Sequence, residues 1–144
     1  VRAGVFNVDL RETDFGQAGR RKKIYKIIAS VYGPASSAAC PGLFCKITQK
    51  QAYAGGGVGE LSNYCYLGDL TGEGDGDAYD YVTKEFEMPT SDVSGYTINF
   101  NSVYTIQLFI KSYISSTDTT FTRAVDRNWS LNDLSIVYRR KAVN

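Results

Sequence analysis

The chain of 144 residues contains no histidine, and this absence removes several kinds of chemistry. Without an imidazole there is no Ser-His or Cys-His nucleophile system and no histidine-ligated metal site. No glycine-rich stretch lies between a strand and a helix, as phosphate-binding loops require. Carboxylates are numerous, but no pair stands out as a glycosidase-type hydrolase would need. We therefore expect a protein that is not an enzyme.

The chain also lacks an excess of charge and any long apolar run. Its formal net charge is +1, which argues against a nucleic-acid partner. The longest apolar run, residues 27–31, is interrupted by Ser30 and is far shorter than the roughly 20 residues that cross a bilayer as a helix. We expect a soluble chain that forms a single domain over residues 1–144.

The residues that are plentiful favour β-structure. Tyrosine supplies 11 residues and glycine 14, whereas methionine and tryptophan occur once each. Apolar and polar residues alternate with period two, and no helical stripe is present. The alternation predicts strands at GVFNVDLR (4–11), IYKIIASVY (24–32), LFCKITQ (43–49), YVTKEFEM (81–88), YTINF (96–100), VYTIQLFIKSYI (103–114) and LSIVYR (134–139). This spacing predicts an all-β fold, an antiparallel β-sandwich of about eight strands.

Polar or glycine-rich stretches between these strands predict loops at residues 14–23, 54–60, 68–77 and 115–120. The third loop region is acidic, with carboxylates at Asp69, Glu73, Asp75, Asp77 and Asp80. Calcium binds six to eight oxygens, and the glycines would let several of these carboxylates converge. The same residues also fit a loop that is merely solvated by its charges. Calcium is the only cofactor that the sequence suggests.

The first loop ends in a basic run formed by Arg20, Arg21, Lys22 and Lys23. Such a run can attract anionic lipid headgroups or sulfated sugars, and it can equally be a solvated turn before a strand. If it lies at the same end of the fold as Ser115, Ser116, Thr117 and Asp118, the two loops form a basic, hydroxyl-rich tip.

Three cysteines cannot all pair within one chain. Cys45 alternates with Leu43 and Ile47 on one face of a predicted strand, from which a bridge to Cys65 would close a loop of about twenty residues. Cys40 would then be the odd thiol. A bridge between Cys40 and Cys45 remains the alternative, whereas a metal site is disfavoured because the spacing is not Cys-x-x-Cys.

Two further features lie near the C-terminus. Asn128-Trp129-Ser130 matches an N-glycosylation acceptor, which is compatible with an extracellular surface. Trp129 itself is predicted to pack at the edge of the core.

In chain order, five segments resemble the N-terminal domain of the Delta/Serrate/Jagged family of Notch ligands, a C2-type β-sandwich. They are GVFNVDLRETDFGQAG (4–19), CPGLFCKITQKQ (40–51), YCYLGDLT (64–71), SVYTIQLFIKSYISSTDTT (102–120) and NWSLNDLSIVYRR (128–140). An alternative register, in which residues 24–32 are the family's second strand, stays open.

The resemblance implies a C2-like recognition module that is secreted or forms the extracellular part of a membrane-anchored protein. Its implied partners are a Notch-type receptor or another cell-surface protein, with membrane lipid contacted through loops that correspond to residues 14–23 and 115–120. The rival interpretation is a secreted carbohydrate-binding or adhesion β-sandwich whose acidic loop holds calcium, with a glycan as its partner.

Overall fold

The computed structural model describes residues 7–16, 20–36, 39–49, 64–75, 78–93, 95–112, 125 and 128–141. Eight strands occupy these ranges: β1 (Asn7–Asp9), β2 (Lys22–Tyr32), β3 (Gly42–Gln49), β4 (Cys65–Asp69), β5 (Glu73–Asp75), β6 (Ala78–Glu87), β7 (Val103–Lys111) and β8 (Ser130–Arg140). Every pairing between them is antiparallel. The predicted antiparallel all-β fold is thus confirmed.

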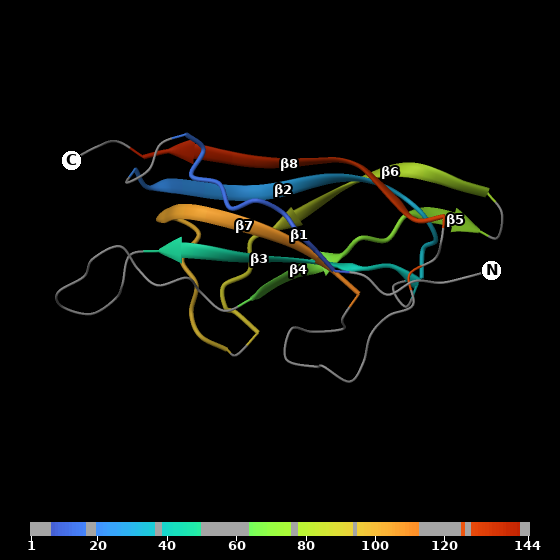
Figure 1. Cartoon of the computed structure of the whole chain (residues 1–144), viewed down its shortest axis with the longest axis horizontal. Coiled ribbons are helices and arrows are strands. Elements are labelled where there is room, and N and C mark those ends of the chain that lie inside the picture. Colours follow the sequence, from blue (N-terminus) through green and yellow to red (C-terminus); the bar gives the residue numbers. More distant parts are fainter. Residues whose placement is uncertain are drawn as a thin grey trace.

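The strands form one curled sheet (Figure 1). The hydrogen-bonded order is β4-β3-β7-β2-β6-β5, with β1 added on β7 and β8 added on β2. β7 and β2 meet at only one pair, Val103 and Lys22, so this is where the sheet turns from one strand group to the other. The first group is β1, β7, β3 and β4, and the second is β8, β2, β6 and β5. The more specific prediction, that the strands form a C2-like β-sandwich, stays a prediction.

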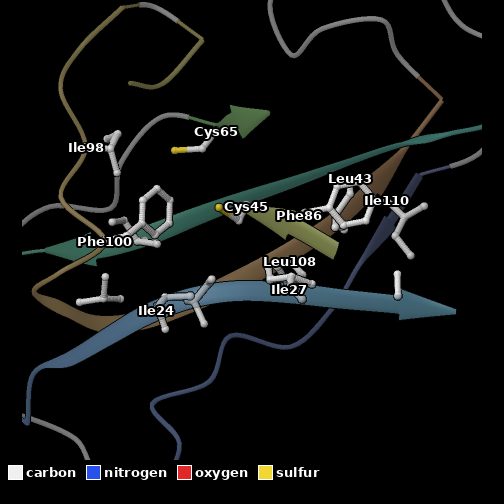
Figure 2. Packing of buried hydrophobic residues seen from close by; sticks show 14 of the residues in the cluster. Ile24, Ile27, Leu43, Cys45, Cys65, Phe86, Ile98, Phe100, Leu108 and Ile110 are labelled. Atoms are coloured by element: carbon white, nitrogen blue, oxygen red, sulfur yellow. The ribbon is translucent and has the colours of Figure 1, made fainter. Parts of the chain in front are cut away.

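The core follows from the period-two alternation of the long strands. In β2, Ile27, Ala29 and Val31 are all fully buried, while the residues between them are partly exposed. The other strand group contributes Leu43 and Cys45 of β3, among others, to the same cluster. Figure 2 shows Ile27, Leu43 and Cys45 close together between β2 and β3, with Phe86 and Leu108 beside them. Apolar side chains from both strand groups therefore share one core.

Two sequence predictions about strands are wrong. Residues 96–100 form no strand, because their hydrogen bonds go to the preceding turn: the Tyr96 amide donates to the Asp92 side chain and the Ile98 amide donates to the Thr90 carbonyl. Only an isolated bridge joins Ser91 to Thr97. In turn, the predicted loop at 68–77 contains β5, which forms a hairpin with β6.

The connection between β4 and β5 is fixed by three hydrogen bonds. The Leu70 amide donates to the Pro41 carbonyl at 2.9 Å, and the Gly72 amide donates to the Pro34 carbonyl at 3.0 Å. Trp129 Nε1 donates to the Leu70 carbonyl at 2.8 Å while its ring packs against the core, which confirms its predicted place at the core edge. The connection is thus tied to three other parts of the chain.

Candidate functional site: the basic end of the sheet

The basic run of the first loop lies beside a second basic run that the sequence places 120 residues away. Lys22 and Lys23 are the first strand residues of β2, and they pair with Arg140 and Arg139 at the end of β8. Because β2 and β8 are antiparallel, the start of one lies next to the end of the other (Figure 1). The loop predicted at 14–23 therefore ends earlier than expected, at Arg21.

Two hydrogen bonds hold these segments together where the ladder ends. Arg20 Nε donates to the Lys141 carbonyl at 2.8 Å, and the Lys141 amide donates to the Arg21 carbonyl at 2.9 Å. Both acceptors are backbone carbonyls, which do not neutralise the positive charges. We call the resulting cluster the basic end; its members are Arg20, Arg21, Lys23, Arg139, Arg140 and Lys141.

Lys22 does not belong to this surface, which corrects the prediction that it contributes to a lipid-contacting or receptor-contacting loop. Its side chain is fully buried, and Nζ donates to the Tyr104 carbonyl at 2.9 Å, 5.9 Å from the Phe15 ring centroid. Burial lowers the pKa of Lys22, the Asp14 carboxylate opposes this shift, and Arg20 adds to it. The apolar stem of Lys22 packs in the core, and its ammonium group bonds to β7.

A tight turn closes the core near the basic end. Phe15 has a positive φ of 59°, and its ring stacks on Tyr138 with centroids 4.0 Å apart. Side chains of the turn hold it: the Phe15 amide donates to Thr13 Oγ1 and the Gly16 amide donates to Asp14 Oδ1. An Asp side chain that accepts a bond two residues on is typical of such turns.

Exposed tyrosines accompany the cations. Tyr138 is 36% exposed and Tyr25 is 42% exposed, and Lys23 Nζ lies 4.9 Å from the Tyr25 ring centroid. Tyrosine combines an apolar ring with a polar tip, so it suits an interface between water and an apolar phase. The basic end thus joins positive charge to amphipathic rings, a combination that attracts anionic surfaces.

The structure places Cys45 directly opposite Cys65, on β3 and β4. Both side chains are fully buried, and both point into the core (Figure 2). A hydrogen bond to Cys65, together with burial, raises the pKa of the Cys45 thiol well above its usual range. Cys40 is also buried, and its Sγ donates to the Pro34 carbonyl at 3.4 Å. All three residues are thiols in the structure, so the Cys45–Cys65 disulfide stays a prediction. The register of β3 and β4, which places the two residues opposite each other, favours it.

The backbone register brings two of the predicted acidic residues together, since Glu73 of β5 pairs with Asp80 of β6. Of the acidic set, Asp69 ends β4, whereas Glu73, Asp75 and Asp80 are placed by their backbone in β5 and β6 without describable side chains, and Asp77 lies outside the described residues. Across the described ranges, no group of three or more Cys, Asp or Glu side chains is arranged to hold a metal ion. The calcium site remains a prediction.

The second predicted tip loop cannot be compared with the first. Ser115, Ser116, Thr117 and Asp118 all lie outside the described residues. Asn128, the predicted glycosylation residue, is exposed in a turn before β8.

A polar hollow of about 520 Å³ lies over β7, and no pattern in the sequence predicts it. It is lined by Arg11, Glu12, Thr13, Asp14 and Thr105. The Thr105 hydroxyl donates to Glu12 Oε1 at 2.6 Å. The Thr105 hydroxyl oxygen also lies 2.8 Å from Thr48 Oγ1. A bridge between Thr13 and Ile106 joins the two lining segments, which are about 90 positions apart in the chain.

A third cluster combines lysines with aromatic rings on the face of β3 and β7 that is opposite the main core. Phe44 and Phe109 are buried there, and the Tyr64 ring packs edge-on against both. Lys111 Nζ lies 3.4 Å and Lys46 Nζ 4.3 Å from the Tyr64 ring centroid. Because the ring faces stabilise both ammonium groups, we interpret this cluster as packing rather than as a binding site.

A scan against protein-family models, a search of curated proteins and a search of solved structures found no match to this chain. In the ranges that the structure describes, no helix has the length and apolar character needed to cross a membrane.

Proposed function

We propose that this chain is an extracellular recognition module of the kind found at the N-terminus of Notch ligands, and that its basic end binds anionic phospholipid membranes. The observation that carries the membrane role is the convergence of Arg20, Arg21 and Lys23 with residues 139–141 at the end of two paired strands. Neither run alone distinguishes a binding surface from a solvated turn. Together they bring six cations to one end of the sheet, with two exposed tyrosines beside them.

The charges of the basic end are sufficient for such a role. Each Lys or Arg near an anionic leaflet contributes about 1 kcal/mol, so six of them support reversible binding. Their attraction decays over a Debye length of about 10 Å at 0.1 M salt, so the binding depends on ionic strength. Tyr25 and Tyr138 would add apolar contact at the headgroup level.

The receptor role rests on the resemblance of the five segments. Two of them, LFCKITQ and YCYLG, lie side by side as β3 and β4 with Cys45 opposite Cys65. This neighbouring position supports the register in which both segments match the family, since a bridge between them needs such a position.

The membrane role is tested by sedimentation with liposomes. Wild-type protein should bind vesicles that contain phosphatidylserine and should not bind vesicles of phosphatidylcholine alone. Arg139→Glu/Arg140→Glu should reduce this binding about tenfold or more, because reversing two charges lowers the net charge of the basic end by four units. Raising the salt should weaken wild-type binding in the same direction.

The matched control is Arg11→Glu/Lys26→Glu, which makes the same change in net charge outside the basic end. It should keep most of the binding. Equal binding by the wild type and the Arg139→Glu/Arg140→Glu variant would refute the membrane role. The receptor role has its own test: the wild-type chain should bind immobilised Notch epidermal-growth-factor-like repeats, and absence of binding would reject it.

A further inference from the structure

β8 lies at an edge of the curled sheet. Among the described strands it pairs only with β2, and it runs over 11 residues without a proline (Figure 1). Long edge strands offer rows of backbone donors and acceptors to another chain, and proteins usually shield them with prolines, inward-pointing charges or short length. β8 contains no proline and is not short.

The hydrogen bonds show which residues of β8 face the open edge. The Lys141 amide donates to Arg21, so it points toward β2. The Leu134 amide donates instead to the Asp133 side chain at 2.9 Å, so it points away from β2. Backbone direction alternates along a strand, and therefore the amides of Leu134, Ile136 and Tyr138 face outward.

The same residues are only partly covered on the core face. Leu134 and Ile136 are half-buried although they pack against the core cluster, and Tyr138 is 36% exposed. Their neighbours on β2, Ala29 and Ile27, are fully buried. Apolar surface is thus left open along the edge of β8, beside the outward-facing backbone groups.

We infer that β8 pairs antiparallel with β8 of a second copy of this chain, about a two-fold axis at Ile136. In this register Ile136 lies opposite its own counterpart, and Leu134 lies opposite Tyr138 of the second copy. These are the residues with outward amides, as hydrogen-bonded pairs require. The arrangement is isologous, the usual geometry of a symmetric dimer.

Charge selects a second copy as the occupant and selects this register. An axis at Ile136 brings Asp133 opposite Arg139 of the second copy, and symmetry makes the contact twice. Both residues are exposed and lie on the outer face of the sheet. Axes at Leu134, Ser135 or Tyr138 would place Asp133 opposite Ser135, opposite Val137 or beyond the strand. An axis at Val137 would place Asp133 opposite Lys141, which lies past the end of β8. Opposite charges directly across two strands stabilise the pairing.

The strand is regular over the stretch that this register uses. Its pairing with β2 has two irregularities. One falls between the pairs of Asp133 and Leu131, where the extra residue is Asn132 of β8, and the other falls between the pairs of Val137 and Tyr138, where the extra residue is Tyr25 of β2. From Asp133 to Arg139 no further residue of β8 is skipped in the register. When two copies pair, the Leu134 amide no longer donates to the Asp133 carboxylate and donates instead to a backbone carbonyl of the second copy. The Asp133 carboxylate then interacts with Arg139 of the second copy.

Charge reversal tests the inference by sedimentation equilibrium. The wild-type chain should show a dimer whose population rises with concentration. Asp133→Arg and Arg139→Glu should each weaken the dimer about tenfold, because each replaces two attractive contacts by two repulsive ones. The double variant Asp133→Arg/Arg139→Glu should restore it. Asp133 lies outside the basic end, so its effect is separable from membrane binding.

Cross-linking tests the register. Ser135 would lie opposite Val137 of the second copy in a non-hydrogen-bonded pair, with Cα atoms about 4.5 Å apart, which suits a disulfide. Ser135→Cys/Val137→Cys should form a covalent dimer in oxidised glutathione, whereas neither single variant should. Cross-linking by either single variant as fast as by the double variant would overturn the register. A wild-type chain that is monomeric at all concentrations would overturn the inference itself.

Discussion

Cys45 and Cys65 occupy opposite positions on β3 and β4, with both sulfurs inside the core. This register predicts that oxidative folding joins them and leaves Cys40 as a thiol. The oxidised protein should be lighter by the two lost thiol hydrogens, and a single cysteine should react with iodoacetamide after unfolding. Closing a loop of about 20 residues should raise the free energy of unfolding by about 3 kcal/mol. A proteolytic fragment that joins Cys40 to Cys45 would contradict the pairing.

The reduced protein should lose stability at alkaline pH. The pKa of the Cys45 thiol is raised in the folded state, so the folded protein keeps a proton that the unfolded chain releases. The stabilisation is therefore complete below the ordinary thiol pKa and declines as pH rises above it toward the folded value. Urea unfolding of the reduced wild type between pH 7 and 10 should show this decline, and Cys45→Ala should show less of it.

The alternation of apolar residues was enough to predict the long strands, because one face of each of them packs against the core. Ile27, Ala29 and Val31 illustrate it: in this part of β2 every second residue is fully buried. The alternation also misled at residues 96–100, where Ile98 and Phe100 are buried but the Ile98 amide donates to the Thr90 carbonyl and not to a neighbouring strand. A strand requires both buried side chains on one face and backbone hydrogen bonds to a neighbouring strand. The pattern of a single sequence indicates the buried side chains but not the hydrogen bonds.

Only half of the basic end could be predicted from the sequence. Residues 20–23 are conspicuous in the sequence, but the contribution of Arg139 and Arg140 depends on the pairing of β8 with β2. That pairing joins parts of the chain more than 100 residues apart, and no local pattern specifies it. For the same reason, the sequence could not show that Lys22 turns inward while Lys23 faces outward.

Two substitutions that remove the charge of Lys22 should lower the free energy of unfolding by different amounts. Lys22→Met keeps most of the buried stem and loses the bond to the Tyr104 carbonyl, so it should cost about 1 kcal/mol. Lys22→Ala also leaves a cavity and should cost about 3 kcal/mol. Equal losses in chemical denaturation would show that the stem contributes nothing to packing.

The pH dependence of the stability of the wild type and of Lys22→Met gives a second test of the burial of Lys22. Burial lowers the pKa of Lys22, so the folded protein releases its proton before the unfolded chain does. The cost of the buried charge is complete below the folded pKa and is relieved as pH rises toward the unfolded value of about 10.4. Wild-type stability should therefore rise relative to Lys22→Met between pH 8 and 10. A constant difference would contradict the lowered pKa.

Gly72 lies against the backbone of Gly33, and this contact leaves no space for a side chain. A β-carbon at Gly72 would lie 2.5 Å from the Gly33 nitrogen and would also meet the Gly33 carbonyl, and neither backbone atom can turn aside. Because three hydrogen bonds tie this connection to its neighbours, Gly72→Ala should lower the free energy of unfolding by about 3 kcal/mol.

Gly95→Ala is the control for this substitution, since Gly95 has open space around it and a positive φ of 86°. It should cost only about 1 kcal/mol, the penalty for an L residue in a left-handed conformation. Thermal and urea unfolding of the two variants would compare steric exclusion with backbone strain in one protein. If Gly72→Ala were as stable as Gly95→Ala, the close approach of residues 72 and 33 would not be part of the folded state.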